Sequence, residues 1–138
     1  MEEKIKIIFC CIGSLVVNAL GGWDIWLASL FTVIVLDIVT GIIKAILMRS
    51  NKSSSGGLNS TSMFKGGVKK VIILILVALG EVIDNILPTE EAFIRTMIVS
   101  YYIANESLSI LENIGACGIP LPKGLFKVLD ALKNEDKE

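Results

Sequence analysis

An acid and a base lie seven residues apart inside one long apolar stretch, residues 23–48, where Asp37 and Lys44 interrupt the hydrophobic pattern. On a helix, positions i, i+3, i+4 and i+7 share a face, so Thr40 and Gly41 join the two charges in one polar stripe. An ionisable side chain at the centre of a bilayer costs roughly 2.5 to 3.5 kcal/mol on insertion scales. The stripe therefore predicts a polar partner, or water, within the membrane.

A second polar stripe lies on the last apolar stretch, where the polar side chains of residues 101–113 fall within an arc of roughly 140° at 100° per residue. Antiparallel helices place Glu106 at a depth similar to that of Asp37. Two interpretations stay open: the stripes line water in an assembled pore, or they close a seam within one monomer in which Lys44 neutralises Asp37 and Glu106. The candidate residues of this seam or pore lining are Asp37, Thr40, Lys44, Asn105, Glu106, Ser109 and Glu112.

An ion pair is predicted at the turn between the last two apolar stretches. Asp84 lies close to the end of one stretch, Arg95 close to the start of the next, and Glu81 about one turn before Asp84. The connection is short, so Asp84 and Arg95 reach the same membrane surface. The alternative is that both side chains extend separately to the outer interface without pairing.

The composition is typical of a membrane protein. Of 138 residues, 53% are hydrophobic and none is histidine, and the mean hydropathy is +0.70, whereas soluble domains are about 45 to 50% apolar. The three cysteines, Cys10, Cys11 and Cys117, lack the spacing of a metal or redox site and are interpreted as packing residues. We therefore expect no enzyme, no metal and no cofactor, and the net charge of −1 gives no signal for nucleic acid.

Apolar stretches and breaks between them predict an all-α, polytopic membrane protein that forms a single membrane domain. It has four transmembrane helices, or three if the first stretch does not cross, plus a short C-terminal amphipathic helix. The expected elements are spans at about residues 7–22, 24–48, 71–87 and 92–117, a cytoplasmic loop at 49–70 and an amphipathic cytoplasmic tail at 119–138.

Lysine and arginine set the predicted orientation. They occur in the N-terminal head, the long loop and the tail, whereas the two short turns at residues 21–24 and 88–91 contain none. The positive-inside rule then gives cytoplasmic N- and C-termini for four spans, or an external N-terminus for three. A signal peptide is the alternative interpretation of the first stretch, although its head carries Glu2 and Glu3.

Several motifs together resemble one family. They are Asp-x-x-x-Gly at residues 37–41, a Ser/Gly-rich loop leading to Gly-Gly-x-Lys-Lys at 66–70, Val-Ile-Asp at 82–84, Asn-Glu-Ser-Leu-Ser-Ile-Leu-Glu-Asn at 105–113 and Cys-Gly-Ile-Pro-Leu-Pro-Lys at 117–123. In this order they are similar to the toxin-secretion and phage-lysis holins of Gram-positive phages and clostridial toxin loci. The last two motifs are the specific part of the resemblance.

The resemblance implies a non-enzymatic hole former of the bacterial inner membrane. Such proteins oligomerise into lesions that release an endolysin or a toxin and so time host lysis, with the bilayer, further copies of the chain and an antiholin as partners. The resemblance supplies no catalytic or cofactor residues. Two other functions stay open: a small four-span exporter coupled to protons through Asp37 or Glu106, and a regulatory subunit such as an antiholin.

Overall fold

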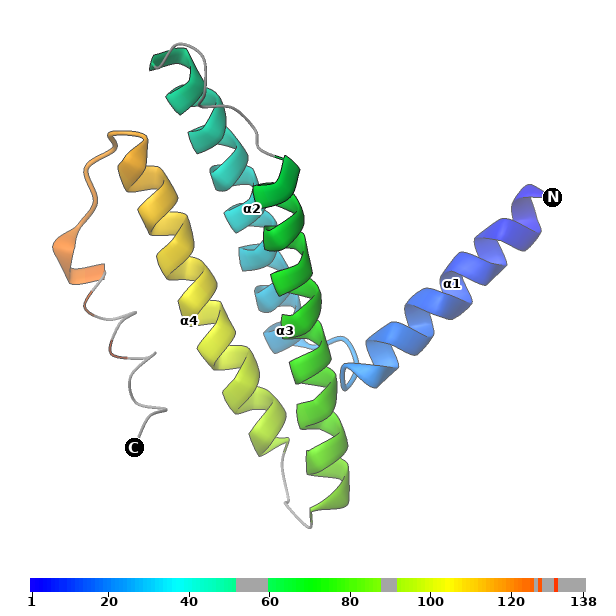
Figure 1. The fold of residues 1–138 in the computed structure, drawn as a ribbon. Helices are drawn as coiled ribbons and strands as arrows, with labels where there is room; N and C mark the ends of the chain where they lie inside the picture. The colour runs from blue at the N-terminus through cyan, green and yellow to red at the C-terminus, as the bar shows by residue number, and fades with distance from the viewer. Residues whose placement is uncertain (52–59, 88–91, 126, 128–130, 132–138) are drawn as a thin grey trace.

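A computed structural model describes residues 1–51, 60–87, 92–125, 127 and 131. These residues form four long helices: α1 (Glu2–Ala19), α2 (Ile25–Asn51), α3 (Ser60–Ile86) and α4 (Phe93–Ala116) (Figure 1). The described part of the chain contains no strand. The all-α prediction is therefore confirmed.

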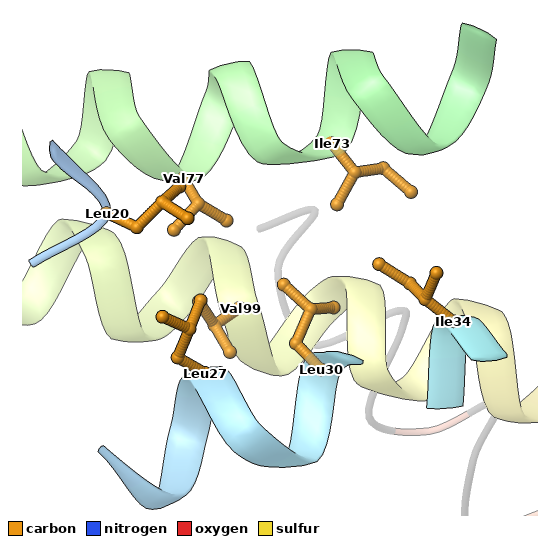
Figure 2. Packing of buried hydrophobic residues seen from close by; sticks show 7 residues of the cluster. All are labelled: Leu20, Leu27, Leu30, Ile34, Ile73, Val77 and Val99. Atoms are coloured by element: carbon orange, nitrogen blue, oxygen red, sulfur yellow. The ribbon is translucent and has the colours of Figure 1, made fainter. Parts of the chain in front are cut away.

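Helix α4 is the central element of the bundle, because it packs along both α2 and α3. The side chains of the three helices meet in a small apolar core (Figure 2). On α2 the core residues recur at the i, i+3 and i+7 spacing of one helical face, as amphipathic packing requires. The core cluster consists of Leu20, Leu27, Leu30, Ile34, Ile73, Val77 and Val99.

Large apolar side chains also cover the outside of the molecule. Val35, Ile38 and Ile46 on α2 and Ile75 and Val82 on α3 are exposed. Monomeric soluble proteins rarely expose apolar surface on this scale. By length and composition, one described helix, α2, could cross a membrane, over Ile25–Leu47. The number of spans, four or three, therefore stays a prediction.

Helix α1 stands apart from the other three, and Figure 1 shows it directed away from the bundle. It has no buried residue, and its apolar side chains, such as Phe9 and Leu15, are exposed. The turn after it contains Gly21 and Gly22, both with positive φ, at 89° and 87°. These two glycines make the sharp change of direction, since a left-handed backbone is strained for other residues.

The loop expected at 49–70 is shorter than the sequence predicts. Helix α2 continues to Asn51 and α3 begins at Ser60, so Gly66, Gly67 and Lys70 are helical. Each glycine costs a helix about 1 kcal/mol, but the tertiary contacts of Lys70 and of the core residues that follow it outweigh that cost. Most of the tail predicted at 119–138 lies outside the described residues.

Candidate functional site

The first polar cluster joins one charged residue from each of three helices. The Lys70 ammonium on α3 donates to Asp37 Oδ2 on α2 at 2.7 Å, and also to Glu106 Oε2 on α4. Glu106 is buried, at 4% exposure, and the other two side chains are mostly buried. We call these three residues the Lys70 triad. Two carboxylates share one ammonium in it.

The helical repeat explains why these three residues meet. Asp37 follows the core residue Ile34 by three positions, Lys70 precedes Ile73 by three, and Glu106 follows Val99 by seven. Each charge thus lies on the core-facing stripe of its own helix. The triad forms a polar layer next to the apolar core.

Asn113 on α4 extends the triad along α2. Its Nδ2 donates to Asp37 Oδ1 at 3.3 Å and to Thr40 Oγ1 at 3.4 Å, and its Oδ1 accepts from Lys44 Nζ at 3.4 Å. Gly41 packs beside this amide, and a Cβ there would make an ordinary van der Waals contact with Asn113 Nδ2, at 3.7 Å. The structure thus places Lys70, not Lys44, between the two carboxylates.

The remaining residues of the predicted stripe occupy two different places. Asn105 and Ser109 line a cavity of about 440 Å³ beside the Lys70 triad. Glu112 is exposed and lies outside this cavity lining. Within the described residues, no group of three or more cysteine, aspartate or glutamate side chains is placed to hold a metal ion.

The second polar cluster surrounds Arg95 at the start of α4. Arg95 is 2% exposed, and its Nε donates to the carbonyl oxygen of Leu20 at 2.6 Å. Its Nη1 and Nη2 donate to the two oxygens of Asp24 at 2.6 and 3.2 Å, the bidentate geometry that suits a guanidinium. Glu81 Oε2 lies 3.8 Å from Arg95 Nε. We call this group the Arg95 clamp.

The carboxylate of Asp84 has a different role from the one predicted. It accepts the backbone N–H groups of Ile94 and Arg95, at 2.9 and 2.8 Å. These N–H groups belong to the first turn of α4 and have no partner within the helix, so a carboxylate there caps it. Asp84 therefore binds the backbone of Arg95, while the guanidinium turns to Asp24.

Asp24 also caps a helix, because its Oδ1 accepts the backbone N–H of Leu27 at 2.8 Å. The hydrogen bond from Arg95 holds the pKa of Asp24 below its ordinary value of 3.8, helped by the bond from Leu27 and opposed by partial burial. Gly21 packs directly against the clamp: a Cβ there would lie 2.5 Å from Arg95 Nε and closer still to Glu81 Oε2.

Comparison with known proteins identifies the family. The model of the bacteriophage holin family matches residues 14–134, a range that contains both polar clusters. The chain belongs to the bacteriophage holin family. The resemblance seen in the sequence motifs is thereby confirmed, and holin-family membership indicates a membrane protein.

Relatives of the chain occur in bacteria and in a phage. An uncharacterized 14.9 kDa protein in the nagH 3' region of Clostridium perfringens is 36% identical over 90% of this chain and 89% of its own. An uncharacterized protein of Halalkalibacterium halodurans is 33% identical over the full length of both chains. A Bacillus phage phi105 protein named "Probable holin" is 30% identical over 75% of this chain and 71% of its own. No solved structure matches at a significant level.

Two central residues of this holin-family chain were not among the predicted site residues. The charge pattern groups Lys70 with the positive charges of the loop at 49–70 and places Asp24 in the short turn at 21–24. A helical extension of the Ile73 and Val77 stripe by one turn would have placed Lys70 on the core face. Asp24 directly before an apolar helix is a helix-start signal, but that signal does not identify Arg95 as its partner.

Proposed function

We propose that this protein acts as a holin, forming homo-oligomeric lesions in the bacterial inner membrane that let an endolysin or toxin pass and that time lysis. Beyond family membership, one observation supports this function: Asp37, Lys70 and Glu106 face the interior of the bundle, while large apolar side chains face outward. This arrangement suits a monomer that waits in lipid. It also gives each helix a polar face that can line water after assembly.

The energetics of the Lys70 triad favour such a change of state. Buried ion pairs contribute little net stability, because desolvation of both charges offsets most of their attraction. Exchanging the triad for hydrated charges in a lesion wall therefore costs little. A small difference in free energy between closed and assembled states then decides which one is populated.

The same proposal includes four spans with cytoplasmic N- and C-termini. The largely apolar part of α1, residues 7–19, is about 20 Å long, shorter than the hydrocarbon thickness of about 30 Å, so α1 would cross a locally thinned bilayer. Residues 7–19 are apolar except for Ser14 and Asn18, and α1 has no buried residue, so this part of the helix is suited to lipid rather than to water. In this topology the Arg95 clamp lies near the outer surface, and the Lys70 triad lies deeper in the membrane, because Glu106 follows Arg95 by eleven residues, about 16 Å along α4.

The proposed function is tested by inducing the protein in a bacterium that also contains a cytoplasmic endolysin without an export signal. A voltage-sensitive dye should report a sudden collapse of the membrane potential, followed by lysis. Growth with an undisturbed potential, at high membrane levels of the protein, would contradict a holin. A pH-dependent flux across a polarised membrane would indicate the exporter instead, and delayed lysis beside a known holin would indicate the antiholin.

A further inference from the structure

Helix α1 has two faces of different chemistry. At about 100° per residue, its cysteine and polar side chains after residue 6 fall within an arc of about 100°. They are Cys10, Cys11, Ser14 and Asn18, and Ile7 lies in the same arc. We call these five residues the polar face of α1. The opposite side of the helix carries exposed apolar side chains, among them Ile5, Ile8, Phe9, Ile12, Leu15 and Val16.

The bundle of the same chain leaves the polar face uncovered. All five of its residues are exposed, and α1 is directed away from the other helices (Figure 1). Arg95 Nε binds the carbonyl oxygen of Leu20, and Gly21 packs against the same side chain. The Arg95 clamp therefore fixes the turn that directs α1 outward. The polar face is available to a molecule outside the bundle.

The two faces of α1 suit different surroundings in a membrane. Large apolar side chains suit lipid, whereas small and hydrogen-bonding side chains are enriched where transmembrane helices pack on one another. Cys10 and Ser14 are four residues apart, the spacing of small residues that lets two helices approach closely. Asn18 continues this spacing by another four residues and adds an amide. The occupant of the polar face is therefore a protein helix.

The polar groups of this face are complementary to themselves. The Ser14 hydroxyl and the Asn18 amide each contain a donor and an acceptor, so each can pair with the same residue of a second copy. Copies of one chain in one bilayer share their orientation, so their α1 helices run parallel and present identical residues at identical depth. A two-fold axis between the helices makes such a contact self-complementary.

The charges at the start of α1 fit the same pairing. Glu3 and Lys4 are both exposed and lie on opposite sides of the midline of the polar face. In a parallel two-fold pair, each side of one helix lies beside the opposite side of its partner. Glu3 of each copy is then next to Lys4 of the other, and ion pairs of this kind favour one partner and one orientation.

We propose that the polar face of α1 is the contact between two copies of this chain, in a parallel two-fold pair. The helices approach at Cys10, Cys11 and Ser14, the amides of Asn18 pair, and the opposite side of each helix faces lipid. Because the Arg95 clamp fixes the direction of α1, this contact links two bundles. The inference rests on the homo-oligomer of the proposed function and gives that oligomer a specific interface.

The test is disulfide cross-linking of the full-length protein in the membranes of intact bacteria, with copper phenanthroline as oxidant and electrophoresis without reductant. All variants carry Cys117→Ser, so the remaining cysteines, Cys10 and Cys11, are both on α1. These two should give a cross-linked dimer. The matched control moves the thiol to the lipid side by combining Cys10→Ser, Cys11→Ser and Ile12→Cys. A disulfide needs Cα atoms within about 7 Å, so the dimer yield of the control should be about tenfold lower.

A second pair of variants adds the same side chain to each face at adjacent positions. Asn18→Leu removes the amide pair and places bulk between the helices, so it should lower the dimer yield of Cys10 and Cys11 about fivefold. Ala19→Leu adds leucine on the lipid side and should change the yield less than about twofold. Immunoblots of the membranes check that both variants are present at equal levels.

Three results would overturn this interface: equal dimer yields from the two faces, equal effects of the two leucine variants, or a cross-linked product that contains a protein other than this chain. Failure of the interface and failure of the proposed function are separable. Equal cross-linking of both faces together with collapse of the membrane potential removes only the α1 interface. Face-selective cross-linking without any collapse removes only the holin function.

Discussion

The Lys70 triad and the Arg95 clamp are both groups of buried charges that link helices, yet they are built differently. In the triad, side chains bind only side chains, with Asn113 also donating to Asp37, and two carboxylates share one cation. In the clamp, a planar guanidinium binds a backbone carbonyl and both oxygens of one carboxylate, while Asp84 fixes the backbone of the same residue. The difference indicates that the clamp stabilises one arrangement, whereas the triad can exchange partners.

The largest effect is expected from removing the guanidinium. Arg95→Leu leaves the Leu20 carbonyl without its donor and the Asp24 carboxylate, which is 38% exposed, without its cation, so we expect a loss of about 2 to 3 kcal/mol, mainly from the unmade buried hydrogen bonds. Urea unfolding of the protein in detergent micelles measures this loss. Lys65→Gln, which removes an exposed cation, is the control. If both variants unfold at the same urea concentration, the clamp does not stabilise the fold.

Gly21→Ala should destabilise the Arg95 clamp by placing a methyl group against it. The new Cβ meets Arg95 and Glu81, and φ of +89° is strained for alanine, so we expect a loss of about 1 to 3 kcal/mol. Gly22→Ala separates the two causes, since Gly22 has almost the same φ but no atom within 4 Å of a Cβ. The midpoint temperature of thermal unfolding should therefore be lower for Gly21→Ala than for Gly22→Ala. An equal fall in midpoint for both variants would mean that backbone strain alone is responsible.

Lys70→Gln should change timing more than stability. The carboxylates of Asp37 and Glu106 lose their cation, but the neighbouring cavity lets them hydrate, so we expect a loss of about 1 to 3 kcal/mol. Because the closed state is weakened, induced cells should lyse earlier than with the wild type, as optical density measures. Glu112→Gln, which changes an exposed carboxylate outside the triad, should keep wild-type timing. Later lysis for Lys70→Gln would contradict a closing role for the triad.

The smallest effect is the pH dependence of the clamp. The pKa of Asp24 is lowered in the folded protein, so its contribution to stability is fully present above the unfolded pKa and is lost as the pH falls through the folded pKa. Its side chain is 38% exposed, and solvent screening limits the contribution to about 1 kcal/mol or less. Unfolding midpoints between neutral pH and pH 3 should fall further for the wild type than for Asp24→Asn. Parallel curves would show that this carboxylate does not contribute.

Helical periodicity was sufficient to place Asp37 and Glu106 on stripes that meet, because both residues continue a regular pattern of core positions. It was not sufficient to identify their cation. Lys70 follows glycines and serines that are typical of a loop, yet α3 begins at Ser60. Composition was therefore sufficient to predict the all-α fold class. Which lysine enters the bundle depended on where α3 begins.

The partner of Arg95 depended on a feature that periodicity does not describe. Asp24 and the Leu20 carbonyl reach the guanidinium because Gly21 and Gly22 turn the chain back toward α4 with positive φ. Pairing by membrane depth favoured Asp84, which lies at the right level but accepts backbone N–H groups instead. Membrane depth thus limits which residues can pair with Arg95, and the geometry of the turn at Gly21 and Gly22 decides which of them does.

Helix α4 carries the central arginine of one cluster and a carboxylate of the other, eleven residues apart. Eleven residues complete slightly more than three turns at 3.6 residues per turn, so Arg95 and Glu106 project from the same side of α4. Rotation of α4 about its own axis would therefore move Arg95 and Glu106 away from their partners at the same time. One residue inserted between them would twist one against the other by about 100°, so the length of this segment is constrained more tightly than its individual side chains.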